Sequence, residues 1–110
     1  MNAALLKARQ RAQTALERDY GGSFSIGGTT YTGAVSLDSV HRVLNDSGNW
    51  ESRQTIHVSV LKTRMPTPPA RLTELVHASI SFKVDGEIGG QNALDVAWLI
   101  TASRKLPAPA

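Results

Sequence analysis

Residues 24–31 read FSIGGTTY, and in this segment apolar residues begin to recur at every second position. Phe24 and Ile26 alternate with serines, which is typical of a β-strand with one buried face. Gly27 and Gly28 fit the centre of a two-residue turn, because glycine accepts positive φ angles. Residues 29–37 then supply a returning strand rich in Thr, Tyr and Val. The segment therefore predicts a β-hairpin.

The same alternation recurs farther along the chain. Residues 54–62 alternate apolar and polar side chains, and residues 79–84 do so again. Asp85-Gly86 predicts a second hairpin turn that leads into residues 87–88. A last strand is expected over residues 93–101, with its inward side chains at Leu94, Val96, Trp98 and Ile100. Residues 71–76 fit either a short helix or a strand.

Two segments between these strands are predicted to be long loops. Residues 38–50 are expected to be exposed and mobile, with at most one helical turn near Val43, and with Trp50 anchoring the far end. Residues 65–69 contain three prolines in four positions, which excludes a central strand or a helix there. This second segment is expected to be a stiff extended loop.

Residues 3–20 predict an amphipathic helix that Gly21-Gly22 ends in a left-handed turn. Its thin apolar face is suited to close packing on a sheet or on a neighbouring subunit. That face comprises Leu5, Ala8, Ala12, Leu16 and Tyr20. The basic face comprises Lys7, Arg9, Arg11 and Arg18.

Together these elements predict a mainly β (α+β) fold in one domain over residues 1–110. The N-terminal helix at 3–20 precedes a β region at 23–104 and a tail at 105–110. Five to six strands with two long loops form a small antiparallel β-barrel or sandwich, because curling removes exposed strand edges.

The chain has a formal net charge of +3 and no cysteine. Disulfides and thiolate metal sites are therefore excluded. No apolar run approaches the length of a membrane span, and the N-terminus lacks a secretory apolar core. Lys7, Arg9 and Arg11 equal the whole net charge, whereas the rest of the chain is balanced. The basic character thus belongs to the helix rather than to a broad surface.

Enzymatic and metal-binding motifs are not evident in the sequence. His41, His57 and His77 are scattered and are interpreted as exposed or capping residues. There is no Gly-x-Ser-x-Gly elbow and no phosphate-binding glycine motif. An enzyme would require one of these histidines to converge with an acid in a pocket.

The order of the parts resembles small neck proteins of tailed bacteriophages, the head–tail joining or head-completion class. A short helix precedes FSIGGTTY, a polar loop and a strand follow, and then come the prolines at 66–69. The hairpin SISFKVDG at 79–86 follows, and the similarity ends on AWLITASR at 97–104. The resemblance covers most of the chain.

The resemblance implies a structural virion protein without catalytic residues, metal or cofactor. Such proteins are small β-barrels that form rings on the portal complex, close the filled head and dock the tail. The implied partners are further copies in a hexamer or dodecamer, portal or adaptor and tail proteins, and packaged DNA in the channel, with no membrane. The implied location is the virion neck, after assembly in the host cytoplasm. The expected inter-subunit or tail contacts lie in the two loops, at Asn45, Asp46, Asn49, Arg64, Met65, Pro66 and Pro68.

A small nucleic-acid-binding β-barrel is the alternative interpretation. Arg9, Arg11 and Arg18 of the helix would contact phosphates, and Tyr20 or Tyr31 would stack on bases. This alternative predicts salt-dependent binding that weakens when the arginines are removed.

Overall fold

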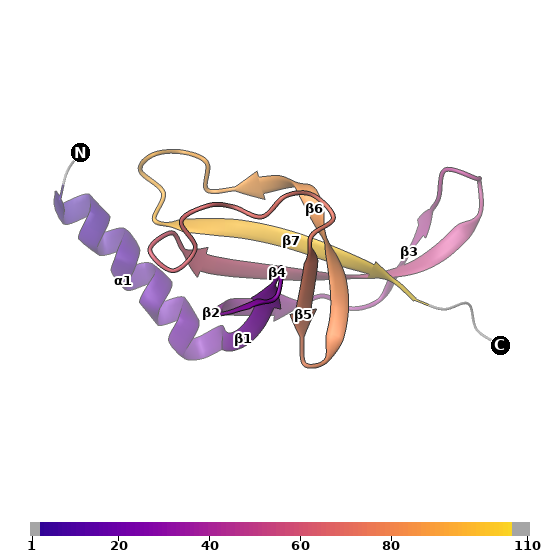
Figure 1. The fold of residues 1–110 in the computed structure, drawn as a ribbon, viewed down its shortest axis with the longest axis horizontal. Coiled ribbons are helices and arrows are strands. Elements are labelled where there is room, and N and C mark those ends of the chain that lie inside the picture. Colours follow the sequence, from indigo (N-terminus) through magenta and orange to yellow (C-terminus); the bar gives the residue numbers. More distant parts are fainter. Residues whose placement is uncertain (1–2, 107–110) are drawn as a thin grey trace.

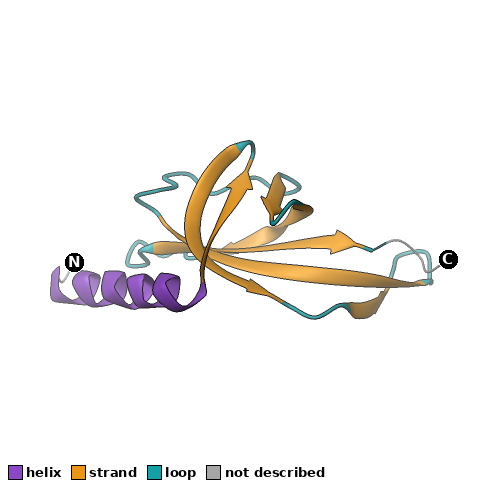
Figure 2. Ribbon diagram, turned by 90° about the horizontal axis from the view of Figure 1, so that it is seen from below, coloured by secondary structure: helices purple, strands orange, loops and turns teal. Residues whose placement is uncertain are grey.

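A computed structural model describes residues 3–106 of the chain (Figure 1). A helix precedes the strands, which are, in chain order, α1 (Ala3–Tyr20), β1 (Gly21–Ile26), β2 (Thr29–Leu37), β3 (His41–Leu44), β4 (Trp50–Leu61), β5 (Glu74–His77), β6 (Ile80–Gly89) and β7 (Ala97–Lys105). The molecule is elongated, measuring 54 × 25 × 23 Å. The helix and the β3 end of the sheet lie at opposite ends of its long axis (Figures 1 and 2).

Six strands form a closed antiparallel barrel. Their order is β2-β1-β5-β6-β7-β4, and pairing between β2 and β4 closes the ring of strands. The short strand β3 pairs with the first residues of β4, outside this ring. The predicted mainly β fold, with an N-terminal helix and a small antiparallel barrel, is confirmed.

The core lies inside the barrel and follows the period of two. In β4 and β7, the even-numbered residues from Ile56 to Val60 and from Trp98 to Ala102 are buried. The largest fully buried side chains are Phe82, Ile56, Leu75, Ile100, Val60 and Val84. Within residues 3–106, no buried side-chain nitrogen or oxygen whose placement is described lacks a hydrogen-bond partner.

The first hairpin forms where the glycines predict it. Gly27 and Gly28 both have positive φ angles, 59° and 86°, and β1 pairs with β2 on either side of them. Both central residues of a type I′ turn need such angles. The hairpin predicted at Asp85-Gly86 is wrong, because β6 runs through it with a register shift between Val84 and Ile88.

The second hairpin turn instead lies at Ala78-Ser79, between β5 and β6. Both residues have positive φ angles, 51° and 66°, although neither is glycine or asparagine. No turn is predicted here from the sequence, because glycine and asparagine are the residues that usually supply such angles. The extended pairing of β5 with β6 on both sides overrides that local preference.

The predicted loop at 38–50 is wrong in its central part, which is a strand rather than a helical turn. His41 to Leu44 pair with Trp50 to Arg53. Asn45 turns the chain, since its Oδ1 accepts hydrogen bonds from the backbone N–H groups of Ser47 and Asn49, each at 3.0 Å. Gly48, with a φ of 80°, completes the turn.

Three other boundaries differ from the sequence-based predictions. The last strand begins at Ala97 rather than residue 93, because Asn92 holds a turn through its Oδ1 and its carbonyl oxygen. Leu94 therefore lies on the surface. Of the two alternatives for residues 71–76, the structure has the strand, which is β5 at Glu74–His77. Of the predicted tail, Lys105 belongs to β7, and residues 107–110 lie outside the described residues.

The helix has the predicted bounds, but two alanines of its predicted apolar face are not buried against the barrel. Ala8 and Ala12 of the predicted apolar face are exposed, whereas Gln13 is buried, with 5% of its surface accessible. The side chains of Leu5, Leu16 and Tyr20 lie outside the described part of the structure. The helix does not end in the predicted left-handed turn, because Gly21 does not have a positive φ angle. Gly21 instead lies so close to the Glu17 carbonyl oxygen that a Cβ at this position would overlap it.

Candidate functional site

Three polar pairs join α1 to the barrel, and we call them the helix clamp. Arg9, Gln13 and Glu17 are spaced four residues apart, so they share one face of the helix. The Arg9 guanidinium donates to the Leu94 carbonyl at 2.7 Å and to the Asp95 carboxylate at 3.0 Å. These contacts fix the angle at which the helix leaves the barrel.

The other two members of the helix clamp use β4 and the loop after it. Gln13 Nε2 donates to the Ser59 carbonyl at 3.1 Å, and the Ser59 hydroxyl donates back to Gln13 Oε1 at 2.7 Å. Arg64 pairs with Glu17 and also donates to the Thr32 carbonyl at 2.9 Å. Arg9 and Arg64 are thus engaged within the chain, which the sequence-based assignment of both to outer contacts did not anticipate.

Replacing Gln13 with Ala is expected to loosen α1 from the barrel. The variant loses both hydrogen bonds to Ser59, so the free energy of local helix opening falls by about 1–2 kcal/mol. Native-state hydrogen exchange of the α1 amides measures this value. The control is Arg11→Ala, at an exposed position of the same helix. Equal exchange in the two variants would show that the buried pair does not hold the helix.

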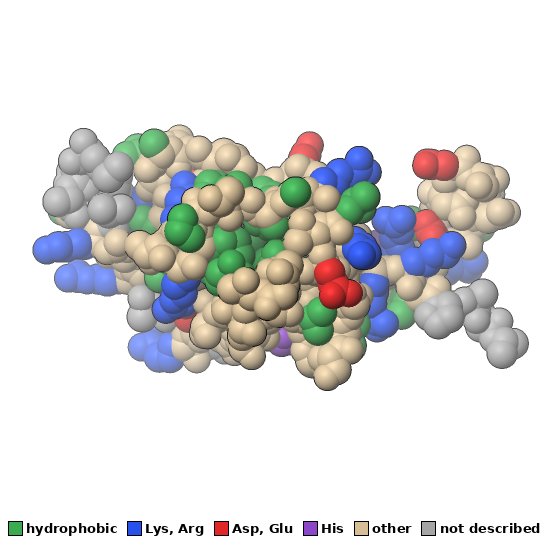
Figure 3. All heavy atoms as spheres, in the orientation of Figure 1, with side chains coloured by type: hydrophobic (Ala, Val, Ile, Leu, Met, Phe, Trp, Pro, Cys, Tyr) green, Lys and Arg blue, Asp and Glu red, His purple; other side chains and the backbone are tan. Residues whose placement is uncertain are grey.

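The remaining members of the predicted basic face lie together on the outside of α1. Lys7, Arg11 and Arg18 are exposed, and with Gln10 and Ala15 they line a shallow hollow of about 320 Å³. Figure 3 shows Lys and Arg side chains at this end of the molecule and again beyond the barrel, towards β3.

At the opposite end, β3 and the start of β4 project from the barrel as a two-stranded ribbon, which we call the arm (Figure 2). Leu44 and Trp50 pair directly, so they share one face, and they are 59% and 63% exposed. Arg42 lies on the same face, with its guanidinium carbon 5.7 Å from the centre of the Trp50 ring. We call Arg42, Leu44 and Trp50 the arm face. The sequence predicted that Trp50 anchors the far end of a loop, but its side chain is exposed rather than buried.

The residues predicted as contacts are divided between surface and core. Asp46 and Asn49 are exposed at the tip of the arm, beside the turn that Asn45 holds. In the proline-containing loop, Pro66 is exposed and Pro68 is partly buried. The prediction for Met65 is wrong: it is 3% exposed, and its carbonyl accepts a hydrogen bond from Trp98 Nε1 at 2.7 Å. Residue type alone did not show this, because the loop folds back over the barrel core.

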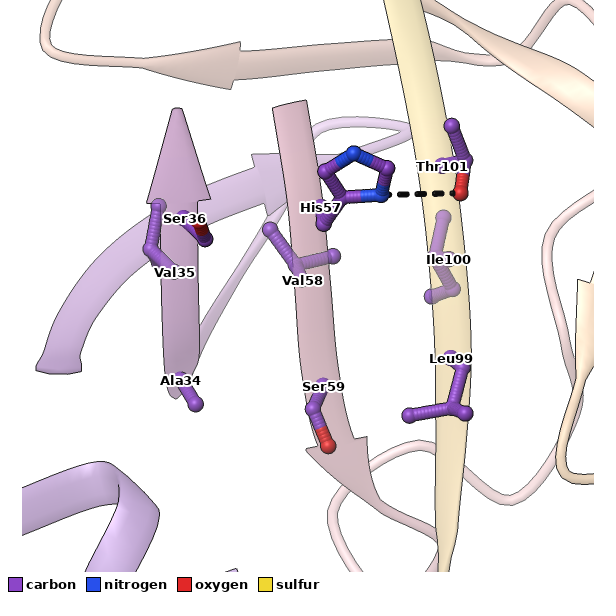
Figure 4. Close-up of a pocket in the computed structure, with 9 residues that line it drawn as sticks. All are labelled: Ala34, Val35, Ser36, His57, Val58, Ser59, Leu99, Ile100 and Thr101. Atoms are coloured by element: carbon purple, nitrogen blue, oxygen red, sulfur yellow. Dashed lines mark hydrogen bonds between the residues drawn. The ribbon is translucent and has the colours of Figure 1, made fainter. Parts of the chain in front are cut away.

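A hollow of about 500 Å³ lies on the outside of the barrel, where β2, β4 and β7 run side by side (Figure 4). We call it the outer hollow. Leu99, at its edge, is 56% exposed. The outward-facing residues that line the hollow are Ala34, Ser36, His57, Ser59, Leu99 and Thr101.

His57 bridges an acid and a hydroxyl at this hollow. Its Nε2 lies 2.9 Å from Asp38 Oδ2. Its Nδ1 lies 3.3 Å from Thr101 Oγ1, and Figure 4 shows this second contact. Acid, imidazole and hydroxyl in this order can pass a proton. Acyl transfer also needs N–H donors aimed at the developing oxyanion. The backbone of β7 around Thr101 is instead paired with β4, and at Leu99 and Ile100 it is also paired with β6.

The Asp38–His57 pair has a structural consequence at the base of the arm. Asp38 is the first residue after β2, and its backbone N–H donates to the Thr55 carbonyl at 2.9 Å. The imidazole contact therefore adds a second link between this residue and β4. Both links fix where the chain leaves β2 for the arm, and we assign the pair this positioning role.

Neither a metal-binding cluster nor a membrane-spanning helix is found within residues 3–106. No group of three or more His, Cys, Asp or Glu side chains there is arranged to hold a metal ion. No helix in the same range combines the length and apolar character needed to cross a bilayer.

The arm face and the outer hollow were both missed by sequence reasoning. A signal for the arm was present, since Leu44 and Trp50 flank a polar turn as hairpin partners do. The hollow had no local signal, because its walls come from three strands that are distant in sequence. The sequence matches no protein-family model and no curated protein.

Proposed function

We propose that this chain is a structural component of the neck of a tailed bacteriophage. It would form a ring, a hexamer or dodecamer, between the portal or adaptor and the tail, closing the head and docking the tail. The observation that carries the proposal is the exposed arm face on a rigid closed barrel. Large apolar side chains gathered on a projecting surface mark a protein–protein contact.

The positions of the arm, the basic face of α1 and the accessible loop residues support the same proposal. The arm and the basic face of α1 lie at opposite ends of the long axis, so one subunit can contact different partners at its two ends (Figure 1). Asp46 and Asn49 at the arm tip, and Pro66 in the proline-containing loop, are accessible for tail or neighbour contacts. Packaged DNA passing through the ring would face Lys7 and Arg11 if α1 lines the channel.

A small nucleic-acid-binding barrel is the second candidate, and a specific observation favours it. Lys7, Arg11 and Arg18 are exposed on one side of α1, and such a stripe contacts phosphates. Arg9, which the sequence-based alternative also used, is engaged with Asp95. The stripe is therefore shorter than the sequence suggested, and we rank this function second.

Native mass spectrometry with and without a DNA oligonucleotide tests both functions. For a neck component we expect closed rings at high protein concentration, no mass shift with DNA, and little change between about 50 and 200 mM salt. A monomer that shifts only with DNA would contradict the neck proposal. Loss of that shift in Lys7→Ala/Arg11→Ala/Arg18→Ala would then identify the helix as the nucleic-acid interface.

A further inference from the structure

We propose that the arm face of one copy docks on the outer hollow of a second copy. This inference rests on the proposed ring-forming function and names the two surfaces that would join its subunits.

The arm face continues the inner face of the barrel beyond its end. Even-numbered residues of β4 point inward, and the same alternation leads from Ile56 back through Gln54 to Trp50. Arg104 donates two hydrogen bonds to Gln54 Oε1, at 2.9 and 2.7 Å, and its guanidinium lies 5.8 Å from the Phe82 ring centre. This pair covers the end of the core. The arm face therefore lies on the same side of β4 as the core, but beyond the end of the barrel, where it is exposed.

The composition of the arm face is typical of an interface centre. Trp and Arg are enriched among residues that dominate binding energies. Trp50 and Arg42 are stacked against each other, and Leu44 lies directly opposite Trp50. On the reverse face of the ribbon, Glu51 is instead paired with Arg53 at 3.3 Å and Lys105 at 3.4 Å. The reverse face is therefore satisfied by ion pairs, and the arm face is the side available to a partner.

The outer hollow has the size and lining to receive the arm face. Its volume of about 500 Å³ lies within the range of sites that bury whole small molecules. Small residues, Ala34, Ser36 and Ser59, form its floor, so a large side chain can approach the sheet closely. Leu99 offers an exposed apolar side chain for contact with an indole ring.

Charge also favours this pairing. The arm face carries Arg42 and no acid. Beside the outer hollow, on the other side of Leu99 and Thr101, Asp85 and Glu87 outnumber Arg71 around a second depression. An arginine arriving with Trp50 would meet net negative charge there, which favours the docked orientation.

One copy cannot make this contact with itself. Trp50 lies seven positions from His57 and nine from Ser59, the outward-facing β4 residues of the hollow, or about 23–30 Å along one strand. A symmetric contact between two arm faces would bring two Arg42 side chains together. Docking of the arm face on the outer hollow of a second copy avoids this repulsion, and in a head-to-tail arrangement it builds a ring when its rotation closes.

Two single variants separate the two halves of the proposed interface. Trp50→Ser removes the arm face, and Leu99→Glu blocks the outer hollow. Both positions are exposed, so neither change should unfold the barrel, which circular dichroism can check. We expect each variant alone to self-associate about 30-fold or more weakly than the wild type. Mixing them should restore one intact interface and give a 1:1 heterodimer in analytical ultracentrifugation. Leu94→Ser, at an exposed leucine outside both surfaces, is the control.

The outcomes separate this inference from the proposed function. If rings persist in both variants, other surfaces join the subunits, and the neck proposal stands without the docking proposal. If Leu99→Glu still dimerises and mixing gives nothing new, the contact is symmetric and the docking proposal is wrong. A wild type that stays monomeric up to about 1 mM also overturns it, since ring assembly on a portal complex would then need other surfaces.

Discussion

Replacing Phe82 with Ala is expected to lower the free energy of unfolding by about 3–5 kcal/mol. Phe82 is 1% exposed and is one of the largest fully buried side chains of the barrel. Its removal leaves a cavity that six closed strands cannot fill by local movement. Because small domains have a total stability of about 5–15 kcal/mol, the variant should be close to unfolding at room temperature. Urea denaturation monitored by tryptophan fluorescence measures the change.

Two further variants test whether the expected loss of stability comes from the buried aromatic ring of Phe82. Phe82→Leu keeps most of the volume and should destabilise by less than about 1.5 kcal/mol. Leu44→Ala removes a side chain from the exposed arm face and should stay within about 0.5 kcal/mol of the wild type. A Phe82→Ala loss below about 1 kcal/mol would mean that Phe82 is not part of the stabilising core.

Local sequence patterns were sufficient for the elements whose neighbours are close in sequence. The helix bounds at 3–20 and the hairpin at Gly27-Gly28 follow from periodicity and glycine chemistry, and both agree with the structure. The inward residues of β4 and β7 likewise follow from alternation. These features depend on backbone preferences that each segment carries by itself.

The features that sequence reasoning missed depend on distant partners. Asp85-Gly86 has the chemistry of a turn, yet it lies within β6 because β7 pairs with residues on both sides of the register shift. Ala8 and Ala12 were placed on the contact face of α1 because apolar periodicity was the visible signal, and both are exposed. The polar contacts of the helix instead have the partners Ser59, Arg64 and Asp95, which lie far along the chain.

The candidate site shows the same division between local and distant information. The basic residues of α1 could be identified from the sequence, but only the fold shows that Arg9 turns to Asp95. The arm could be suspected from the turn residues at 45–49, but not its exposed face. That face exists because β4 is longer than the barrel that it helps to close, which is a property of the whole sheet.

The pairing between β2 and β4 closes the barrel, and we call it the seam. Adding a single methyl group there should have the second-largest effect on the free energy of unfolding. Gly33 is buried in β2, and a Cβ there would overlap the Ser59 carbonyl oxygen of β4 and lie 3.2 Å from the Phe24 ring. Gly33→Ala therefore requires the two strands to separate, and we expect a loss of about 3 kcal/mol in unfolding free energy. Amide exchange in β2 and β4 should accelerate together, since the seam opens as a unit.

Gly86→Ala is the matched control, because it also adds one methyl group to a strand glycine of ordinary φ. The nearest atom is Cδ of Arg71 at 3.3 Å, the flexible part of a side chain that can move aside. This variant should change stability by less than about 0.5 kcal/mol. Ser59 holds Gln13 and also lines the outer hollow, so Gly33→Ala should in addition release α1 and weaken self-association. If Gly33→Ala matched Gly86→Ala in every measurement, pairing between β2 and β4 would not be what closes the barrel.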